Sequence, residues 1–305
     1  MTKKRPITNI SASIHDRLLQ LARQQGIQYQ EALQYFAMER FLYRLSVSEH
    51  VNNFVLKGAL MLRVWRIPQS RLTRDIDLLG FTMNTTEHLS AVVREICQTL
   101  VVDDGIIFPP ALVKVEVIRQ RAEYVGVHVQ FAAHSGSAVV PMQIDIGFAD
   151  AITPAPEMIE YPVMLDFPAP KLRAYPRETT IAEKFHAMVE LGFENTRMKD
   201  FYDLWQMSQT FTFDGNRIAV AIYATFERRG HEMLNETPVA FMEEFINSAA
   251  KETQWKAFAR KNKLKDARSW SITVSAVHDW LAPIMLPALA RQPVNWTWQP
   301  GTGWH

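Results

Sequence analysis

The first part of the chain has apolar residues at helical spacing. They form two runs in which residues three or four positions apart are apolar: Leu18, Leu21 and Ala22, and then Leu33, Phe36, Ala37, Phe41 and Leu45. This spacing places them on one face of a helix, so residues 11–46 are predicted to form one or two helices that pack on another element. The pattern breaks near Gly26.

A short apolar stretch after the predicted helices, at residues 54–56, leads into Lys57-Gly58, which is interpreted as a turn. Residues 59–65 are predicted to form a helix that begins at this turn.

The middle of the chain alternates between apolar and other residues. Val125, Val127, Val129 and Phe131 occupy every second position, which is the period of a strand with one buried face. Similar reasoning predicts strands over 72–81, 115–118 and 139–148. A helix is predicted over 87–100, between the first two of these strands.

The last third of the chain reads as helical after a proline-rich segment. Six prolines lie between residues 153 and 176, and this density predicts a connecting segment. Thr180 and Glu183 have the spacing of a capping box, which predicts that a helix begins there. Further helices are predicted to about Leu289. The sequence therefore predicts an α+β protein with a mixed-sheet domain over 1–176 and a helical domain over 177–305.

Two carboxylates stand at alternate positions of the predicted strand 72–81. Asp75 and Asp77 flank Ile76, so both side chains lie on one face with their Cα atoms roughly 6.5–7 Å apart. Carboxylates at this distance repel each other unless a cation lies between them. Oxygen ligands of this kind suit a divalent cation. The pair therefore predicts a metal site, although an Asp-x-Asp pattern by itself is common.

The neighbouring motifs strengthen this interpretation. The turn at Gly58-Ala59 opens a predicted helix, where backbone amides and the helix dipole can bind phosphate. Asp145 lies on the predicted strand 139–148 and faces the same way as Gln143. Three carboxylates could hold two magnesium ions that bridge a nucleoside triphosphate. The alternative for Asp145 is a capping or turn residue.

Composition excludes several other classes of protein. The formal net charge is +1, which gives no support to a DNA-binding regulator built on the N-terminal helices. The basic segment 251–268 is interpreted as a solvated helix face, with a nucleic-acid contact as the alternative. The single Cys97 excludes a zinc site of several cysteines and an internal disulfide, and it favours a cytoplasmic protein. No apolar run approaches the roughly 18–20 residues of a membrane span.

Four segments together resemble the AbiEii/AbiGii nucleotidyltransferase toxin family of type IV toxin–antitoxin systems. They are Lys57-Gly58-Ala59-Leu60, Arg71-Leu72-Thr73-Arg74-Asp75-Ile76-Asp77, Ile181-Ala182-Glu183-Lys184, and Arg197-Met198-Lys199-Asp200-Phe201-Tyr202-Asp203-Leu204. The resemblance implies a DNA polymerase β-like nucleotidyltransferase fold with a helical C-terminal domain. It also implies magnesium, a nucleoside triphosphate (NTP) donor and a separately encoded antitoxin. Members are associated with phage defence by abortive infection, and some transfer nucleotides to the 3′ end of tRNA.

By position, the resemblance assigns roles to individual residues. Asp75 and Asp77 match the metal-binding pair, Lys184 matches a lysine expected near the triphosphate, and Asp200 matches an aspartate thought to assist catalysis. The residues predicted to bind the nucleotide are Lys57, Gly58, Ala59, Thr73 and Lys184. Ala59 stands where a second glycine or a serine is frequent, and Thr73 where serine is frequent. Taken alone, Lys184 would be a surface lysine, and Lys199 with Asp203 a surface ion pair.

The sequence hypothesis is therefore a magnesium-dependent toxin that transfers a nucleoside monophosphate (NMP) from an NTP to an acceptor hydroxyl, with the 3′ end of tRNA as the acceptor. Asp145 completes the metal site or acts as the base. One alternative is transfer to a protein or a small molecule. Another is a non-catalytic nucleotide-binding regulator that keeps the fold without the activity.

Overall fold

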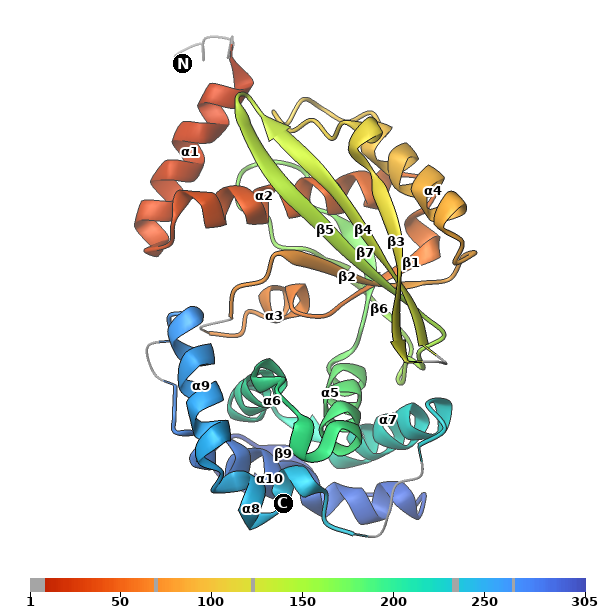
Figure 1. Cartoon of the computed structure of the whole chain (residues 1–305), viewed down its shortest axis with the longest axis vertical. Coiled ribbons are helices and arrows are strands. Elements are labelled where there is room, and N and C mark those ends of the chain that lie inside the picture. The colour runs from red at the N-terminus through yellow and green to blue at the C-terminus, as the bar shows by residue number, and fades with distance from the viewer. Residues whose placement is uncertain (1–8, 69–70, 122–123, 232–235, 265–266) are drawn as a thin grey trace. The chain divides into compact units, whose positions relative to one another are not determined.

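The computed structural model describes residues 9–68, 71–121, 124–231, 236–264 and 267–305. The chain divides into two compact units (Figure 1). The first unit contains the chain up to residue 64, then 73–149 and 158–174. The second contains 65–72, 150–157 and 175–305. The chain thus passes between the units several times, and the sequence prediction of separate domains divided at residue 176 stays a prediction.

The first unit is built on a seven-stranded sheet with the order β3-β4-β5-β2-β1-β7-β6. The strands are β1 (Phe54–Lys57), β2 (Asp75–Gly80), β3 (Lys114–Arg121), β4 (Tyr124–Ser135), β5 (Ala138–Phe148), β6 (Glu157–Glu160) and β7 (Lys171–Ala174). Strand β2 is antiparallel to β1 and parallel to β5, so the sheet is mixed. The predicted α+β class is confirmed.

Four helices belong to this unit: α1 (Ile10–Gln25), α2 (Tyr29–Val47), α3 (Leu60–Val64) and α4 (Thr86–Gln98). Short 3₁₀ turns lie at Val51–Asn53 and Pro110–Leu112. The side chain of Asn9 caps α1 by accepting a hydrogen bond from the Ala12 amide, and Gly26 ends this helix with a φ of 66°. Capping satisfies amides that have no partner within the helix, so these residues fix where α1 begins and ends.

One face of the sheet forms the core of the unit. Ile76 on β2, Val129 on β4 and Ile144 on β5 are fully buried, and α2 packs on β5 while α4 packs on β3 (Figure 1). Side chains alternate along a strand, so a slip of one residue would turn these apolar groups to the other face. Burial of this face therefore fixes the register, and the register in turn places the polar residues of the same strands on the opposite face.

The second unit is mainly helical. Its helices are α5 (Arg177–Leu191), α6 (Met198–Thr210), α7 (Gly215–Arg228), α8 (Glu243–Ile246), α9 (Ala249–Lys261) and α10 (Trp270–Leu289), with 3₁₀ turns at Gly192–Glu194 and Val239–Phe241. A small sheet has the order β10-β9-β8, formed by β8 (Phe213–Asp214), β9 (Thr297–Gln299) and β10 (Gly303–Trp304).

Helix α10 is the central helix of this unit. Trp270, Trp280 and Leu281 on it are fully buried. Within the described residues it is the one helix long and apolar enough to cross a membrane by length and composition. The buried tryptophans are typical of a core helix. The indole of Trp304 donates to the Trp280 carbonyl at 2.9 Å, so the C-terminal segment is bound to α10 in its own unit.

Two local predictions were wrong. Helix α5 begins at Arg177 after Pro176, and Thr180 lies inside it, because proline is well suited to the start of a helix and Thr180 is buried in the core. The proline-rich segment is not helical, as predicted, and it also holds two short strands, β6 and β7. Lys251 is also not on a solvated face, because it is buried and its Nζ donates to the Asn195 carbonyl at 2.8 Å.

Candidate functional site

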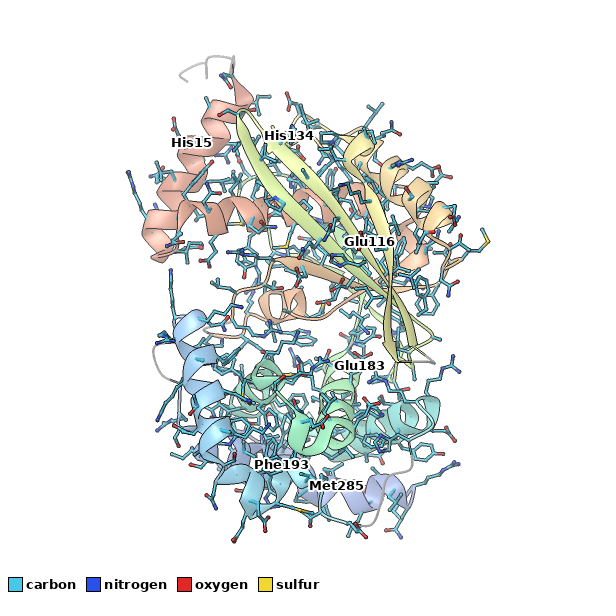
Figure 2. All side chains as sticks on the ribbon, in the orientation of Figure 1. His15, Glu116, His134, Glu183, Phe193 and Met285 are labelled. Carbon is cyan, nitrogen blue, oxygen red and sulfur yellow. The ribbon has the colours of Figure 1, made fainter. Side chains whose placement is uncertain are left out.

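A row of polar residues crosses the sheet on the face opposite its core. The register pairs Lys57 with Asp77, Asp77 with Asp145, Asp145 with His128, and His128 with Glu116. Paired residues on adjacent strands point to the same side. The row therefore runs from β1 to β3, where Glu116 is labelled in Figure 2.

A second row lies beside the first on the same face. Asp75 pairs with Gln143, Gln143 with Gln130, and Gln130 with Lys114. Asp75 and Asp77 therefore lie on one face of β2, and Asp145 lies directly across from Asp77. Adjacent strands are about 4.8 Å apart. The structure thus brings together the three carboxylates that the sequence singled out.

Three aspartates on one sheet face form an oxygen-only donor set. Hard divalent cations such as magnesium bind carboxylate oxygens, so the residues fit such an ion. All three side chains are partly exposed, which leaves them accessible to a ligand. Their role as metal ligands stays a prediction.

Asp145 is held by a neighbour that the sequence had not identified. His128 Nδ1 lies 2.6 Å from Asp145 Oδ1, and Gln130 Nε2 lies 3.0 Å from His128 Nε2. In the sequence, His128 and Gln130 were only the polar positions of an alternating strand. Their alternation with buried valines does show that they share a face. Pairing with Asp145 depends on the β4–β5 register, which a single sequence does not define.

The Gly58 turn packs directly against Asp77. Gly58 has a φ of +72°, and a Cβ atom built there would lie 1.9 Å from Asp77 Oδ2. Glycine is therefore required both by the backbone conformation and by the close carboxylate. The helix that follows, α3, has only five residues, so the predicted contribution of a helix dipole is small. The backbone amides of the turn are better candidates than the helix dipole for binding phosphate, because they can donate hydrogen bonds to its oxygens.

We expect Gly58→Ala to lower both stability and activity. A side chain with positive φ costs roughly 1–2 kcal/mol, and the added methyl must also displace Asp77. Gly26→Ala is the matched control, because Gly26 has a φ of +66° with nothing within 4 Å of a Cβ. Urea unfolding and nucleotide transfer should be measured for both. Equal losses in the two variants would contradict the proposed contact with Asp77.

The helical unit contains a buried network of ion pairs. Lys184 on α5 donates to Asp200 Oδ1 at 2.7 Å and to Asp203 Oδ2 at 2.8 Å. Arg197 binds Asp200 Oδ2 at 2.6 Å, and Arg71 binds Asp203 Oδ1 at 3.0 Å. The two aspartates lie three residues apart on α6 and so share a face. Both carboxylate side chains are about 1% exposed.

This network corrects the interpretation of Asp203 as half of a surface ion pair with Lys199. Asp203 is buried and binds Lys184 and Arg71 instead. Lys184, interpreted in isolation as a surface lysine, has a side chain only 12% exposed. The sequence included Arg71 in a motif but gave it no role. Its partner is 132 positions away.

The charges of this network keep Lys184 and Asp200 ionised. Burial lowers the pKa of Lys184, but Asp200 and Asp203 outweigh burial and raise that pKa overall. Burial raises the pKa of Asp200, but Lys184 and Arg197 outweigh it and hold that pKa well below its usual range. Burial, the largest cause, and the cations Arg71 and Arg197 together lower the pKa of Lys199. Asp200 is therefore poorly suited to accept a proton and well suited to hold Lys184 in place.

The remaining predicted residue, Thr73, lies just before β2. Its Oγ1 is 3.4 Å from both the backbone nitrogen and the carbonyl oxygen of Asp75, and its amide donates to the Tyr35 hydroxyl at 3.2 Å. Thr73 is thus tied to the backbone where the strand begins, close to the first carboxylate. A role in binding the nucleotide stays a prediction.

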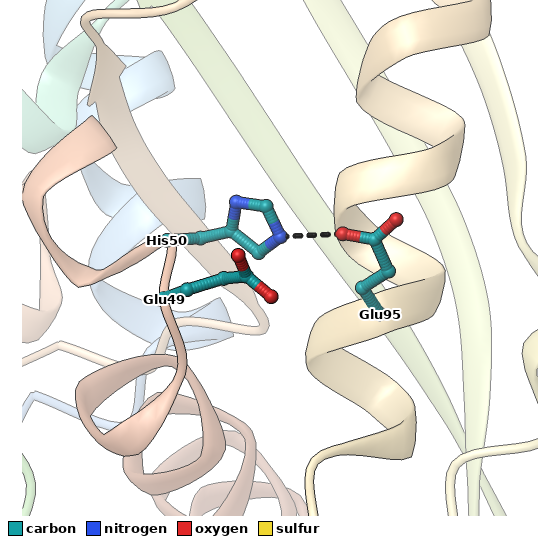
Figure 3. Close-up of side chains that lie close together, drawn as sticks. All are labelled: Glu49, His50 and Glu95. Carbon is teal, nitrogen blue, oxygen red and sulfur yellow. Dashed lines mark hydrogen bonds and ion pairs between the residues drawn. The ribbon is translucent and has the colours of Figure 1, made fainter.

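Another group of potential ligands lies away from this row. Among the described residues, Glu49, His50 and Glu95 have ligand atoms within 4.8 Å of one another. Figure 3 shows the His50 Nε2–Glu95 Oε2 contact of 2.7 Å. This contact is an ordinary hydrogen bond, and both glutamates are exposed. It accounts for the grouping without a metal.

A mixed sheet with paired aspartates beside a glycine turn is compatible with a nucleotidyltransferase. The family model for the nucleotidyl transferase AbiEii toxin of type IV toxin–antitoxin systems matches residues 40–280. The chain therefore belongs to this family, as the sequence motifs predicted. This membership supports enzymatic activity on an NTP and implies a cognate antitoxin.

Two solved structures are similar in fold. A predicted nucleotidyltransferase from H. pylori has 12% identity and a TM-score of 0.48, with 87% of this chain and 97% of that chain covered. JHP933 from Helicobacter pylori has 14% identity and a TM-score of 0.45, with 87% and 94% covered. No curated protein matches the chain.

Proposed function

We propose that this protein transfers an NMP from an NTP to the 3′-terminal hydroxyl of tRNA, using two magnesium ions. The proposal makes it a cytoplasmic toxin that acts in phage defence by abortive infection and is neutralised by its antitoxin. Family membership supports the coarser description of a nucleotidyltransferase toxin. The observation that carries the reaction is the placement of Asp77 across from Asp145, with Asp75 on the same sheet face.

In the proposed reaction, the acceptor oxygen forms a bond to the α-phosphorus of the NTP. The bond from that phosphorus to the oxygen bridging to the β-phosphate breaks, and pyrophosphate leaves with the bonding electrons. The hydroxyl proton passes to solvent water; proton transfer to Asp145, acting as the base instead of as a metal ligand, is the alternative. Magnesium, when bound, neutralises phosphate charge and favours ionisation of the attacking hydroxyl. Asp75 and Asp77 would hold it together with Asp145.

The other predicted residues have proposed roles in binding and positioning. The backbone at Gly58 and Ala59 is suited to donate hydrogen bonds to phosphate oxygens, with Lys57 and Thr73 beside it. Lys184 is proposed to neutralise triphosphate charge. Three cations of its network, Lys184, Arg71 and Arg197, face two carboxylates, so the network keeps an excess positive charge that favours a polyphosphate. Asp200 is proposed to hold Lys184.

The acceptor can be tested by labelling RNA. Full-length protein should be incubated with total RNA and each α-labelled NTP in turn, and the products should be separated by size. We expect label in the tRNA fraction with the preferred NTP. Label should be lost with Asp75→Asn, and it should be lost when periodate first destroys the 3′-terminal diol of the RNA.

Two other outcomes would replace this proposal. Label in the protein or small-molecule fraction would assign the alternative acceptors. Tight nucleotide binding with no transfer under any condition would indicate a non-catalytic regulator. Growth of cells that express the wild type and Asp75→Asn, with and without the antitoxin, tests toxicity separately from the acceptor.

A further inference from the structure

His128 lies in the centre of the polar row and contacts one of its carboxylates. It is on β4, directly across from Asp145 on β5. Its Nδ1 is 2.6 Å from Asp145 Oδ1. An ionised carboxylate only accepts hydrogen bonds, so the proton must be on Nδ1. A donor–acceptor distance this short indicates a strong hydrogen bond.

Gln130 fixes the other nitrogen of the ring. Its amide lies 3.0 Å from His128 Nε2. The two contacts together hold both ring nitrogens of His128, with Nδ1 directed at Asp145. Gln130 is two residues along β4 from His128, so the strand itself places both on one face.

His128 is more buried than Asp145, the residue that it contacts. The His128 side chain is 16% exposed, whereas the Asp145 side chain is 45% exposed. Within the described part of the chain, the hydrogen bond recorded for this carboxylate is at Oδ1. Repulsion from the like-charged carboxylate of Asp77 would tend to rotate the Asp145 side chain away from Asp77. A fixed donor at Oδ1 opposes that rotation and leaves Oδ2 available to a ligand.

We propose that His128 is a positioning residue that holds Asp145 by Oδ1 and presents Asp145 Oδ2 to a divalent cation. The inference rests on the proposed nucleotidyl transfer, in which Asp145 is the third carboxylate. Hydrogen-bond partners of metal ligands typically change metal affinity by about 10–100-fold. His128 would therefore set cation affinity without touching the nucleotide.

Three variants of the full chain distinguish an effect of the His128 hydrogen bond from an effect of side-chain size. His128→Phe keeps a ring but removes the donor. His128→Asn keeps a donor, because the Asn amide nitrogen lies close to where His Nδ1 was. His134→Asn is the matched control, because His134 is also on β4 but lies near its far end (Figure 2).

Manganese binding, measured from the EPR signal of free Mn²⁺, gives a readout that does not depend on activity. We expect His128→Phe to raise the Mn²⁺ dissociation constant about 10-fold or more. His128→Asn and His134→Asn should stay close to wild type. In transfer assays, His128→Phe should need more metal for half-maximal rate, with the KM for NTP at saturating metal unchanged. Equal Mn²⁺ affinity in wild type and His128→Phe would overturn the proposal.

A measurement on the unmodified protein covers the case in which His128→Phe does not fold. Side-chain ¹⁵N spectra should show His128 protonated at Nδ1, with the peak assigned by its absence in His128→Asn. A ring without a proton on Nδ1 would refute the hydrogen bond. If the wild type binds Mn²⁺ but transfers no nucleotide, the proposed function fails while the effect of His128 on affinity still decides this inference.

Discussion

Asp77→Asn is expected to abolish nucleotide transfer and toxicity while the protein stays folded. Asp77 lies across from Asp145 and against the Gly58 turn, so it belongs to both the predicted metal site and the predicted phosphate turn. The amide keeps the volume of the side chain but removes its charge. Metal stabilisation of a transition state is worth several kcal/mol, and a loss of about 4 kcal/mol lowers the rate by about 10³-fold.

The matched control for Asp77→Asn is Glu116→Gln. Glu116 is an exposed carboxylate in the same row, on β3 at two strands from Asp145. Its change removes the same charge from the same sheet face. We expect it to leave transfer nearly unchanged, because Glu116 is outside the aspartate group. A comparable loss in both variants would mean that the charge of the whole face matters, and the assignment of Asp77 as a metal ligand would fail.

The sequence predicted the features of the site that depend on local spacing. Alternation alone places Asp75 and Asp77 on one face of a strand, and the glycine turn before α3 was recognised from a short motif. The apolar patterns predicted the α+β class, and the family motifs implied the nucleotidyltransferase fold. Placement of Asp145 across from Asp77 required the parallel pairing of β2 with β5. Those strands are far apart in the chain, so the sequence alone does not show that they pair.

The features that the sequence did not predict depend on long-range contacts. His128 contacts Asp145 because of the β4–β5 register, and nothing within β4 itself distinguishes that histidine from a surface residue. Arg71 binds Asp203 across 132 positions. A lysine or aspartate on an amphipathic helix is usually solvated, so Lys184 and Asp203 looked ordinary until burial was known. The prediction that a helix begins at Thr180 was wrong because the capping pattern lies inside a helix that already begins after Pro176.

Asp200→Ala is expected to destabilise the helical unit by about 3–5 kcal/mol, because it removes one partner from a buried ion-pair network. Lys184 and Arg197 would each lose a carboxylate oxygen at 2.7 and 2.6 Å. The pKa of Asp200 is lowered in the folded protein, so its stabilising contribution is fully present above the unfolded pKa of about 3.9. That contribution is lost as the pH falls towards the folded pKa. The gap in stability between the variant and wild type should therefore narrow below about pH 4.

Urea unfolding at pH 7 and at acidic pH measures this effect, with Glu160→Ala as the control. Glu160 forms an exposed ion pair with Lys171 at 3.8 Å, and such pairs contribute about 0–1 kcal/mol. Asp200→Ala should unfold at much lower urea than Glu160→Ala at pH 7. If both variants unfold like wild type, the network is not structural. Should Asp200→Ala then also lose nucleotide transfer, Asp200 would act in the reaction, either directly, as the family resemblance implies, or by holding Lys184.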